Sequence, residues 1–289
     1  MATDKMTPQK WAFQLTHILN AYSQGHDRFP VNVKAIAIDF SNQKFPDDPI
    51  AMIKGASLPK FDGGLYRAPV GKKGWGIIFN DSMESKGRIN YTLAHEFGHY
   101  LLHRIDFPNG IECGEQDLVR WDSAYGQIEH EANVFAANLL MPLDDYRRHI
   151  DAKAVVNLDM ISHCANRYDV SLIAATLRWI EYTEHRAVIV VSRDGFILWA
   201  RSSQSAYRSG IYFKTSNRPP IPLPEKSLAS GLITSDNQKH GLKLPAGVWF
   251  NEDCVEMVVF SEQYDFAISI LLLEKNSAFH SKCFNEDKL

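Results

Sequence analysis

The amino-acid sequence predicts an α+β protein with three parts: a small twisted sheet with metal-ligating helices, a helical middle segment, and a small α/β C-terminal domain. Turns and short alternating apolar runs precede two helical segments that carry histidines and glutamates. A clear strand pattern then returns only after residue 185. We place the three parts at residues 1–143, 144–184 and 185–289.

The first 80 residues predict one helix followed by strands. Thr7-Pro8 is typical of a helix start, because threonine caps the first turn and proline fits into it. Strands are predicted at four apolar or alternating runs: residues 33–40, 51–58, 65–67 and 75–80. The last two form a hairpin that leads directly into the next helix. The strand at 75–80 is either an edge that holds an extended peptide by main-chain hydrogen bonds or an internal strand.

The helix that follows carries His95-Glu96-x-x-His99, with Asp81 or Ser85 as its cap. Histidines four residues apart lie on one face of a helix and can share a metal ion. Glu96 then lies beside the metal, where a carboxylate can transfer protons. Gly98 costs about 1 kcal/mol in a helix interior and predicts the close approach of another element.

The third metal ligand is predicted on the next helix, residues 126–142. Glu129 and Glu131 compete for this role, and their side chains point in nearly opposite directions, so only one can face the metal. Glu129 is favoured because its face continues through small residues that allow a close approach to Gly98. Asn133, one turn further, can hydrogen-bond to a ligand histidine.

Two other residues near this motif are weaker candidates. In a straight helix, His103 lies about 12 Å from His95, too far to share the ion, so we interpret it as a partly buried helix-end residue. Cys113 could reach the metal as a thiolate, although a plain reduced thiol is favoured. Four side chains are available to stabilise an oxyanion, and the sequence does not choose among them: Tyr66, Arg67, Tyr125 and His130.

Together, the two motifs resemble the ImmA/IrrE family of zinc metallopeptidases. The first is the helix from His95 to His103, and the second is the Glu129-x-x-Ala132-Asn133 run that ends at Met141-Pro142. The resemblance implies a gluzincin-like (zincin-like) peptidase core with Zn²⁺ on His95, His99 and Glu129 and with Glu96 as general base. The same two imidazoles and carboxylate also accept Mn²⁺ or Fe²⁺.

The resemblance also implies a function. Such peptidases cleave helix-turn-helix repressors in stress-response or mobile-element circuits, so the expected partner is a transcriptional repressor as a protein substrate. The alternative is a metal-stabilised regulator that sequesters a transcription factor without cutting it. The intact Glu96 argues against this alternative, because a purely structural site does not need it.

The middle and C-terminal parts give weaker functional signals. Helices at residues 158–167 and 171–182 resemble a helix-turn-helix, but the second offers little beyond Arg178 to read DNA, so direct nucleic-acid binding is not expected. After it, a β-hairpin, a strand at 211–213, a short helix at 226–233 and a closing antiparallel pair are predicted. Some members of the family carry a sensor-like domain here, which makes a ligand or partner role an open alternative.

Composition and charge set the broad class. The chain is 45% hydrophobic and 22% charged, and its formal net charge of −3 gives no general attraction to nucleic acid or membranes. The N-terminal residues do not have the pattern of a signal peptide, and the longest apolar run, residues 266–273, is too short to span a bilayer. Four widely spaced cysteines fit a reducing compartment. We therefore expect a cytoplasmic protein without a membrane segment.

Overall fold

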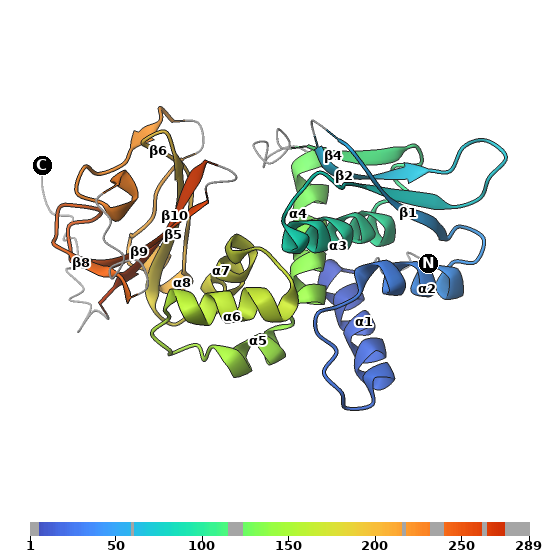
Figure 1. The fold of residues 1–289 in the computed structure, drawn as a ribbon, viewed down its shortest axis with the longest axis horizontal. Helices are drawn as coiled ribbons and strands as arrows, with labels where there is room; N and C mark the ends of the chain where they lie inside the picture. Colours follow the sequence, from blue (N-terminus) through green and yellow to red (C-terminus); the bar gives the residue numbers. More distant parts are fainter. Residues whose placement is uncertain are drawn as a thin grey trace, which may run out of the picture. The chain divides into compact units, whose positions relative to one another are not determined.

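A computed structural model describes residues 6–58, 61–114, 124–215, 218–231, 240–261 and 265–274. The chain divides into two compact units, here called unit 1 (residues 1–151 and 159–179) and unit 2 (residues 152–158 and 180–289). Each unit contains one sheet together with helices (Figure 1). The predicted α+β class is therefore confirmed. Most of the helical segment predicted at 144–184 belongs to unit 1.

Unit 1 combines a four-stranded sheet with seven α-helices among the described residues. The strand order is β1-β3-β2-β4, in which only the β1–β3 pair is parallel. The elements are α1 (Pro8–Ser23), α2 (Val33–Lys44), β1 (Ile50–Ala56), β2 (Phe61–Arg67), β3 (Trp75–Asn80), α3 (Lys86–Leu102), β4 (Gly110–Gly114), α4 (Ala124–Leu140), α5 (Leu143–His149), α6 (Leu158–Tyr168) and α7 (Leu172–Ile180).

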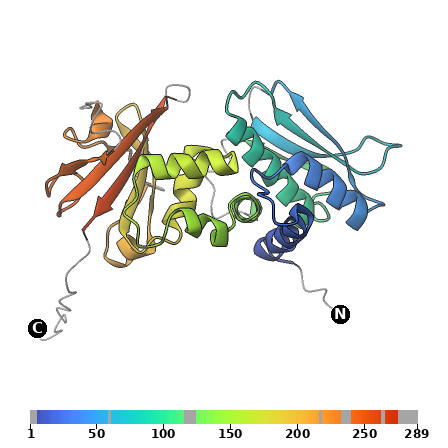
Figure 2. The same cartoon turned by 60° about the horizontal axis from the view of Figure 1, so that its bottom comes forward.

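The helices of unit 1 form layers beneath its sheet. α3 packs against β2 and β3, α2 packs against β1, and α4 crosses α3 on the side away from the sheet (Figures 1 and 2). A row of aromatic rings connects these layers, with centroids 5.6–6.5 Å apart: Trp11, Phe40, Phe97 and Phe135. Edge-to-face rings of this kind stabilise a core beyond the area that they bury.

Residues 33–40 lie in helix α2, so the strand predicted there is wrong. The backbone N–H of Ala35 donates to Asn32 Oδ1 at 3.1 Å, which caps the helix. The buried positions of α2 follow helical spacing: Val33, Ala37, Phe40 and Ser41. Over residues 35–38 alanine and isoleucine alternate without a polar residue between them. Such a short run does not distinguish the period of a strand from that of a helix.

The hairpin of β2 and β3 precedes α3 as predicted, but β3 is internal. It pairs with β1 on one side and with β2 on the other. The described edge beside β2 is β4, at residues 110–114, where no strand was predicted. Of the two alternatives for residues 75–80, the internal strand is therefore the one observed, and β1 and β4 are the edges of this sheet.

Gly98 lies where α4 crosses α3. A Cβ added there would be 2.9 Å from Phe135 Cδ1 and 3.3 Å from Ala132 Cα. These separations are below ordinary van der Waals contact, so the two helices reach this distance because Gly98 has no side chain. The close approach predicted from this glycine is confirmed.

The helix-turn-helix-like pair is α6 and α7, and Ser171 caps the start of α7. Its Oγ accepts from the backbone N–H of Ala174 at 3.2 Å. Arg178, the one basic side chain considered for DNA contact, is 3% exposed. It donates to the carbonyl oxygen of Met141 at 2.8 Å and to Asn138 Oδ1 at 3.0 Å. This arginine therefore joins α7 to the end of α4 and does not present its charge to a ligand.

Unit 2 has an antiparallel sheet in the order β7-β6-β5-β10-β9-β8 over its described residues. The predicted first hairpin and closing pair are present, whereas residues 211–213 are not a strand and residues 228–230 form only a short 3₁₀ turn. The elements are β5 (Arg186–Arg193), β6 (Phe196–Ser202), α8 (Gln204–Arg208), β7 (Ile221–Pro222), η2 (Leu228–Ser230), β8 (Leu242–Leu244), β9 (Cys254–Ser261) and β10 (Phe266–Leu273).

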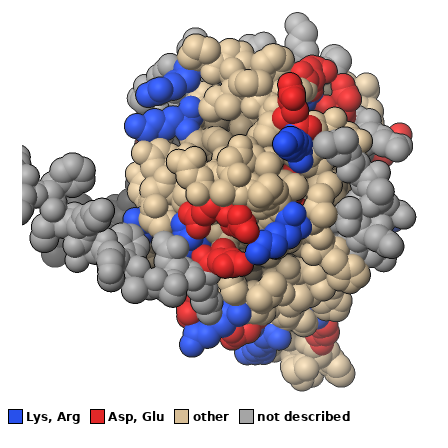
Figure 3. Space-filling view, turned by 90° about the vertical axis from the view of Figure 1, so that its left-hand side faces the viewer, with Lys and Arg blue, Asp and Glu red and all other residues tan. Residues whose placement is uncertain are grey.

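The surface of unit 2 is mixed in charge. On the face seen in Figure 3, the described lysines and arginines lie singly or in pairs, with acidic side chains near several of them and uncharged surface between the groups. The described residues of this face therefore form no large basic patch of the kind that binds nucleic acid. None of the helices in the described ranges has the length and apolar character needed to cross a membrane.

A fully buried carboxylate, that of Glu256, holds unit 2 together. Its Oε2 accepts from the backbone N–H of Leu228 at 2.8 Å and from Trp249 Nε1 at 2.9 Å. Its Oε1 accepts from Ser269 Oγ at 2.8 Å and more weakly from the backbone N–H of Ala229 at 3.4 Å. One side chain thus ties β9 to β10, to η2 and to the loop before β9.

We expect Glu256→Gln to lower the free energy of unfolding by about 2–4 kcal/mol, because an amide NH₂ would face donors and leave buried groups unpaired. Urea denaturation measures this loss. Glu274→Gln is the matched control, because that carboxylate is exposed beside Lys243 and should change stability by less than about 1 kcal/mol. Equal losses in the two variants would contradict the structural role of Glu256.

Candidate metal centre

Helix α3 carries the first motif on one of its faces. It begins after Ser85, whose Oγ accepts from the backbone N–H of Arg88 at 3.2 Å, and it ends at Leu102. Of the two predicted caps, Asp81 and Ser85, Ser85 is therefore the one observed. His95 and His99 lie one turn apart, and their Nε2 atoms are 2.9 Å from each other. Both rings therefore turn their Nε2 atoms toward one point.

Helix α4 brings Glu129 to the same point. Its Oε2 lies 3.2 Å from His95 Nε2, and its Oε1 lies 3.2 Å from His99 Nε2. All three residues are buried, and one ligand atom of each lies within 4.8 Å of the others. Among the residues that the structure describes, no other group of three metal-ligating side chains converges in this way.

The donor set fits a zinc ion. Zn²⁺ binds imidazole nitrogens and carboxylate oxygens at about 2.0–2.2 Å, and a tetrahedron with such bonds has edges of about 3.3 Å. The observed separations of 2.9 and 3.2 Å are close to that edge length. Three protein ligands leave a fourth position for water or substrate, as catalytic zinc sites require.

The charges in the group also suit a metal. Burial opposes ionisation of Glu129, but hydrogen bonds with His95 and His99 outweigh it and hold the pKa of this carboxyl well below its usual range. Burial lowers the pKa of His99 to about 4, so this ring is neutral at pH 7. Burial acts in the same direction on His95, but the hydrogen bond to Glu129 and the charges of Glu96 and Glu129 leave its pKa raised. The group thus holds one ionised carboxylate and a neutral imidazole, the forms in which these residues bind metals.

The outer nitrogen of His95 has a partner on α4, as expected from the sequence. His95 Nδ1 lies 3.2 Å from Asn133 Oδ1. The hydroxyl of Tyr91, one turn earlier on α3, donates to the same Asn133 oxygen at 3.3 Å. This arrangement directs His95 Nε2 toward Glu129 and His99. The part played by Tyr91 was not predicted.

Glu131 contacts a different histidine from Glu129. Its Oε2 lies 3.1 Å from His103 Nε2, and His103 Nδ1 lies 3.1 Å from His99 Nδ1. Glu129 is therefore the carboxylate that joins the two motif histidines. His103 does cap the end of α3, as expected, but it is 2% exposed and contacts a site residue.

Glu96 is fully buried beneath strand β2. A Cβ added to Gly63 of this strand would lie 3.2 Å from Glu96 Oε1 and 2.6 Å from Thr92 Cγ2. Because Gly63 has no side chain, the face of α3 that carries Glu96 packs directly against the sheet. The glycine pair was the available signal, but it was interpreted as a turn before the strand predicted at residues 65–67, whereas it lies inside β2.

The four candidate oxyanion donors are placed differently from one another. Gly63 faces α3, so Gly64 and Tyr66 face the opposite side of the sheet, where the Tyr66 ring covers Gly64. Arg67 pairs with Asp48. His130 is exposed next to Glu129, and the side chain of Tyr125, like that of Cys113, lies outside the described residues. Tyr66 and Arg67 are therefore not placed to stabilise an oxyanion at the metal group.

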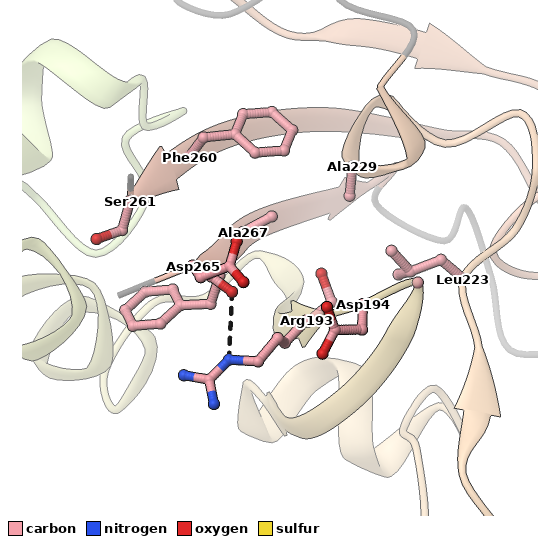
Figure 4. A pocket seen from close by; sticks show the side chains of 11 residues that line it. Arg193, Asp194, Leu223, Ala229, Phe260, Ser261, Asp265 and Ala267 are labelled. Carbon is pink, nitrogen blue, oxygen red and sulfur yellow. Dashed lines mark hydrogen bonds between the residues drawn. The ribbon is translucent and has the colours of Figure 1, made fainter. Parts of the chain in front are cut away.

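Unit 2 has an open pocket of about 220 Å³ at the turns of its β5–β6 and β9–β10 hairpins (Figure 4). Arg193 Nε donates to the carbonyl oxygen of Asp265 at 3.2 Å and thereby joins the two turns. Phe260 and Leu223 add apolar surface to the pocket. It contains none of the residues that the sequence singled out as site candidates.

A buried His–His–Glu group with a glutamate beside the first histidine, on a helix beneath a small sheet, is the arrangement that zinc metallopeptidases use. Residues 51–179 match the family model described as the IrrE N-terminal-like domain, which is a peptidase family. This match supports the resemblance of the two motifs to the ImmA/IrrE family. The match ends at Trp179 and covers nothing after it. A comparison with curated proteins gave no match.

We expect Gly63→Ala to lower the free energy of unfolding by about 1–3 kcal/mol, because its methyl group would overlap Thr92 Cγ2. Adding Thr92→Ala removes this atom and should recover part of the loss, so the two changes are not additive. Gly76→Ala in β3 is the matched control, since its new Cβ would meet Met52 Cε at 3.5 Å, an ordinary contact. Chemical denaturation of the single and double variants measures the coupling, and additive losses would contradict this contact.

Proposed function

We propose that this chain is a zinc-dependent endopeptidase in which His95, His99 and Glu129 hold the metal. The observation that carries the proposal is the convergence of two imidazole nitrogens and one carboxylate. Glu96 directly follows the first of these histidines on α3. The match to a peptidase family supports the proposal. Zinc bound there supplies a Lewis acid that polarises the scissile carbonyl and lowers the pKa of water toward ~7. The same donors also accept Mn²⁺ or Fe²⁺.

Glu96 is the general base of this proposal. It directly follows His95 on α3, and it is buried under β2, away from bulk water. Its carboxylate takes a proton from the attacking water and then gives that proton to the leaving amine, which returns the carboxylate to its starting form. A site that only stabilised the fold would not require an acid–base residue at this position.

The proposed substrate is an extended segment of a protein chain that pairs with β4. This strand is the described edge next to β2, and β2 covers Glu96 through Gly63. An edge strand offers unpaired main-chain N–H and C=O groups, which bind a peptide without regard to its sequence. A substrate held along β4 would lie one strand away from β2, the strand that covers the general base.

The substrate class follows from the family: a helix-turn-helix transcriptional repressor in a stress-response or mobile-element circuit. Within this chain, the helix-turn-helix-like pair commits Arg178 to internal hydrogen bonds. This favours a separate protein as the DNA-binding component, with this chain as the protease that acts on it in the cytoplasm.

Zinc should stabilise the metal-free protein against thermal unfolding, by about 4 kcal/mol at a free zinc concentration a thousand times its Kd. Glu129→Ala removes one of three ligands and should lose most of this gain. Asp144→Ala serves as the control, because it removes an exposed carboxylate of unit 1 beside Arg148. Thermal melts with zinc and with a chelator measure the difference. An undiminished gain in Glu129→Ala would refute the ligand assignment.

Glu96→Gln should bind one zinc ion and lose cleavage by at least about a hundredfold, because an amide cannot accept the proton. Zinc content and cleavage are measured together, with the repressor-like protein encoded nearest in the genome as substrate. If wild type and variant both hold zinc and bind the repressor but neither cuts it, the protein is a sequestering regulator and the peptidase proposal fails.

A further inference from the structure

A chain of hydrogen-bonding groups runs from the metal group to the opposite flank of α4. It begins at His99, passes through His103, and ends at Glu131, with separations of 3.1 Å at each step. The second oxygen of Glu131 accepts from Gln127 Nε2 at 2.7 Å. His99 is fully buried and His103 is 2% exposed, so protein groups surround both rings.

We infer that His103 and Glu131 are positioning residues that fix the tautomer and the ring orientation of His99; this inference rests on the proposed function. An ionised carboxylate can only accept hydrogen bonds, so Glu131 requires the proton of His103 on Nε2. When His103 is neutral, its Nδ1 is a bare acceptor, and His99 then donates to it from its own Nδ1. Nε2 of His99 is left with its lone pair directed at His95 and Glu129.

The carboxylate of Glu131 can only accept hydrogen bonds, and this gives the chain of hydrogen bonds a single direction. Two neutral imidazoles facing each other can share a proton in either sense, because each ring nitrogen can donate or accept. Glu131 removes this ambiguity. Asn133, the partner of His95, is less decisive, because an amide can present either its oxygen or its NH₂ group after a flip. The two ligand histidines therefore have different supports, and the carboxylate supports His99.

This role also accounts for the burial of His103. It lies beyond the reach of the metal group, yet it is packed at the end of α3 with both ring nitrogens in contact with other side chains. Partners of this kind typically change metal affinity by about 10–100-fold when they are removed. We therefore expect Glu131 to change zinc affinity through its contact with His103 and not through the charge of Glu131 alone.

Zinc affinity measured by competition with a chelator tests this without substrate. Glu131→Ala and His103→Leu should each weaken zinc binding by about 10–100-fold. The double variant should be no weaker than either single variant, because both changes break the same chain. His103→Gln should bind zinc nearly as well as wild type, because its amide can accept from His99 and donate to Glu131. Additive losses would show that Glu131 acts by charge alone and would overturn the inference.

The proton positions give a second readout that does not depend on activity. In the zinc-loaded wild type, ¹H–¹⁵N correlations of the imidazole rings should show His103 neutral, with Nε2 protonated and Nδ1 bare. A proton on His103 Nδ1 would overturn the inference. Failure of wild type to bind zinc would instead refute the proposed function. Wild-type zinc affinity and cleavage in Glu131→Ala would refute this inference alone.

Discussion

The close crossing of α3 and α4 is the constraint on which the candidate metal centre depends. Helix α3 supplies both histidines, but two imidazoles alone do not complete a zinc site of the catalytic kind. Glu129 reaches them because Gly98 lets Ala132 approach α3 without an intervening side chain. The core aromatic pair Phe97 and Phe135 packs at the same crossing, with centroids 5.6 Å apart. Core packing and the geometry of the metal group are therefore set by the same contact.

Those parts of the site that lie within one helix could be predicted from the sequence. His95 and His99 are brought together by helical geometry alone, since residues four apart share a face. Glu129 required a further step, because the choice against Glu131 depended on which face of α4 turns toward Gly98. That choice was available from the small residues on the Glu129 face. The contact between His103 and Glu131 joins two helices at a distance of 28 residues, and no local pattern reveals it.

The errors in the predicted fold have a common physical origin. Residues 33–40 were assigned to a strand because alanine and isoleucine alternate there, although the Asn32 cap and the spacing of Val33, Ala37 and Phe40 fit a helix. The order of strands cannot be obtained from periodicity, because alternation gives the two faces of a strand and not its neighbours. The internal position of β3 and the edge position of β4 are therefore tertiary information. The same applies to Gly63, whose role depends on which helix lies beneath it.

Three residues of α4 at alternate positions serve the site, and the crossing angle explains how they can. Glu129 faces the metal group, Asn133 lies one turn further along the same face, and Glu131 lies on the other flank. Because α4 runs across α3 and not along it, Asn133 and Glu131 meet different turns of α3. Asn133 reaches His95, and Glu131 reaches His103. Each ligand histidine thus receives its outer support from the helix that delivers the third ligand. A displacement of α4 would move the carboxylate and both supports at once, so the site is either assembled as a whole or lost as a whole.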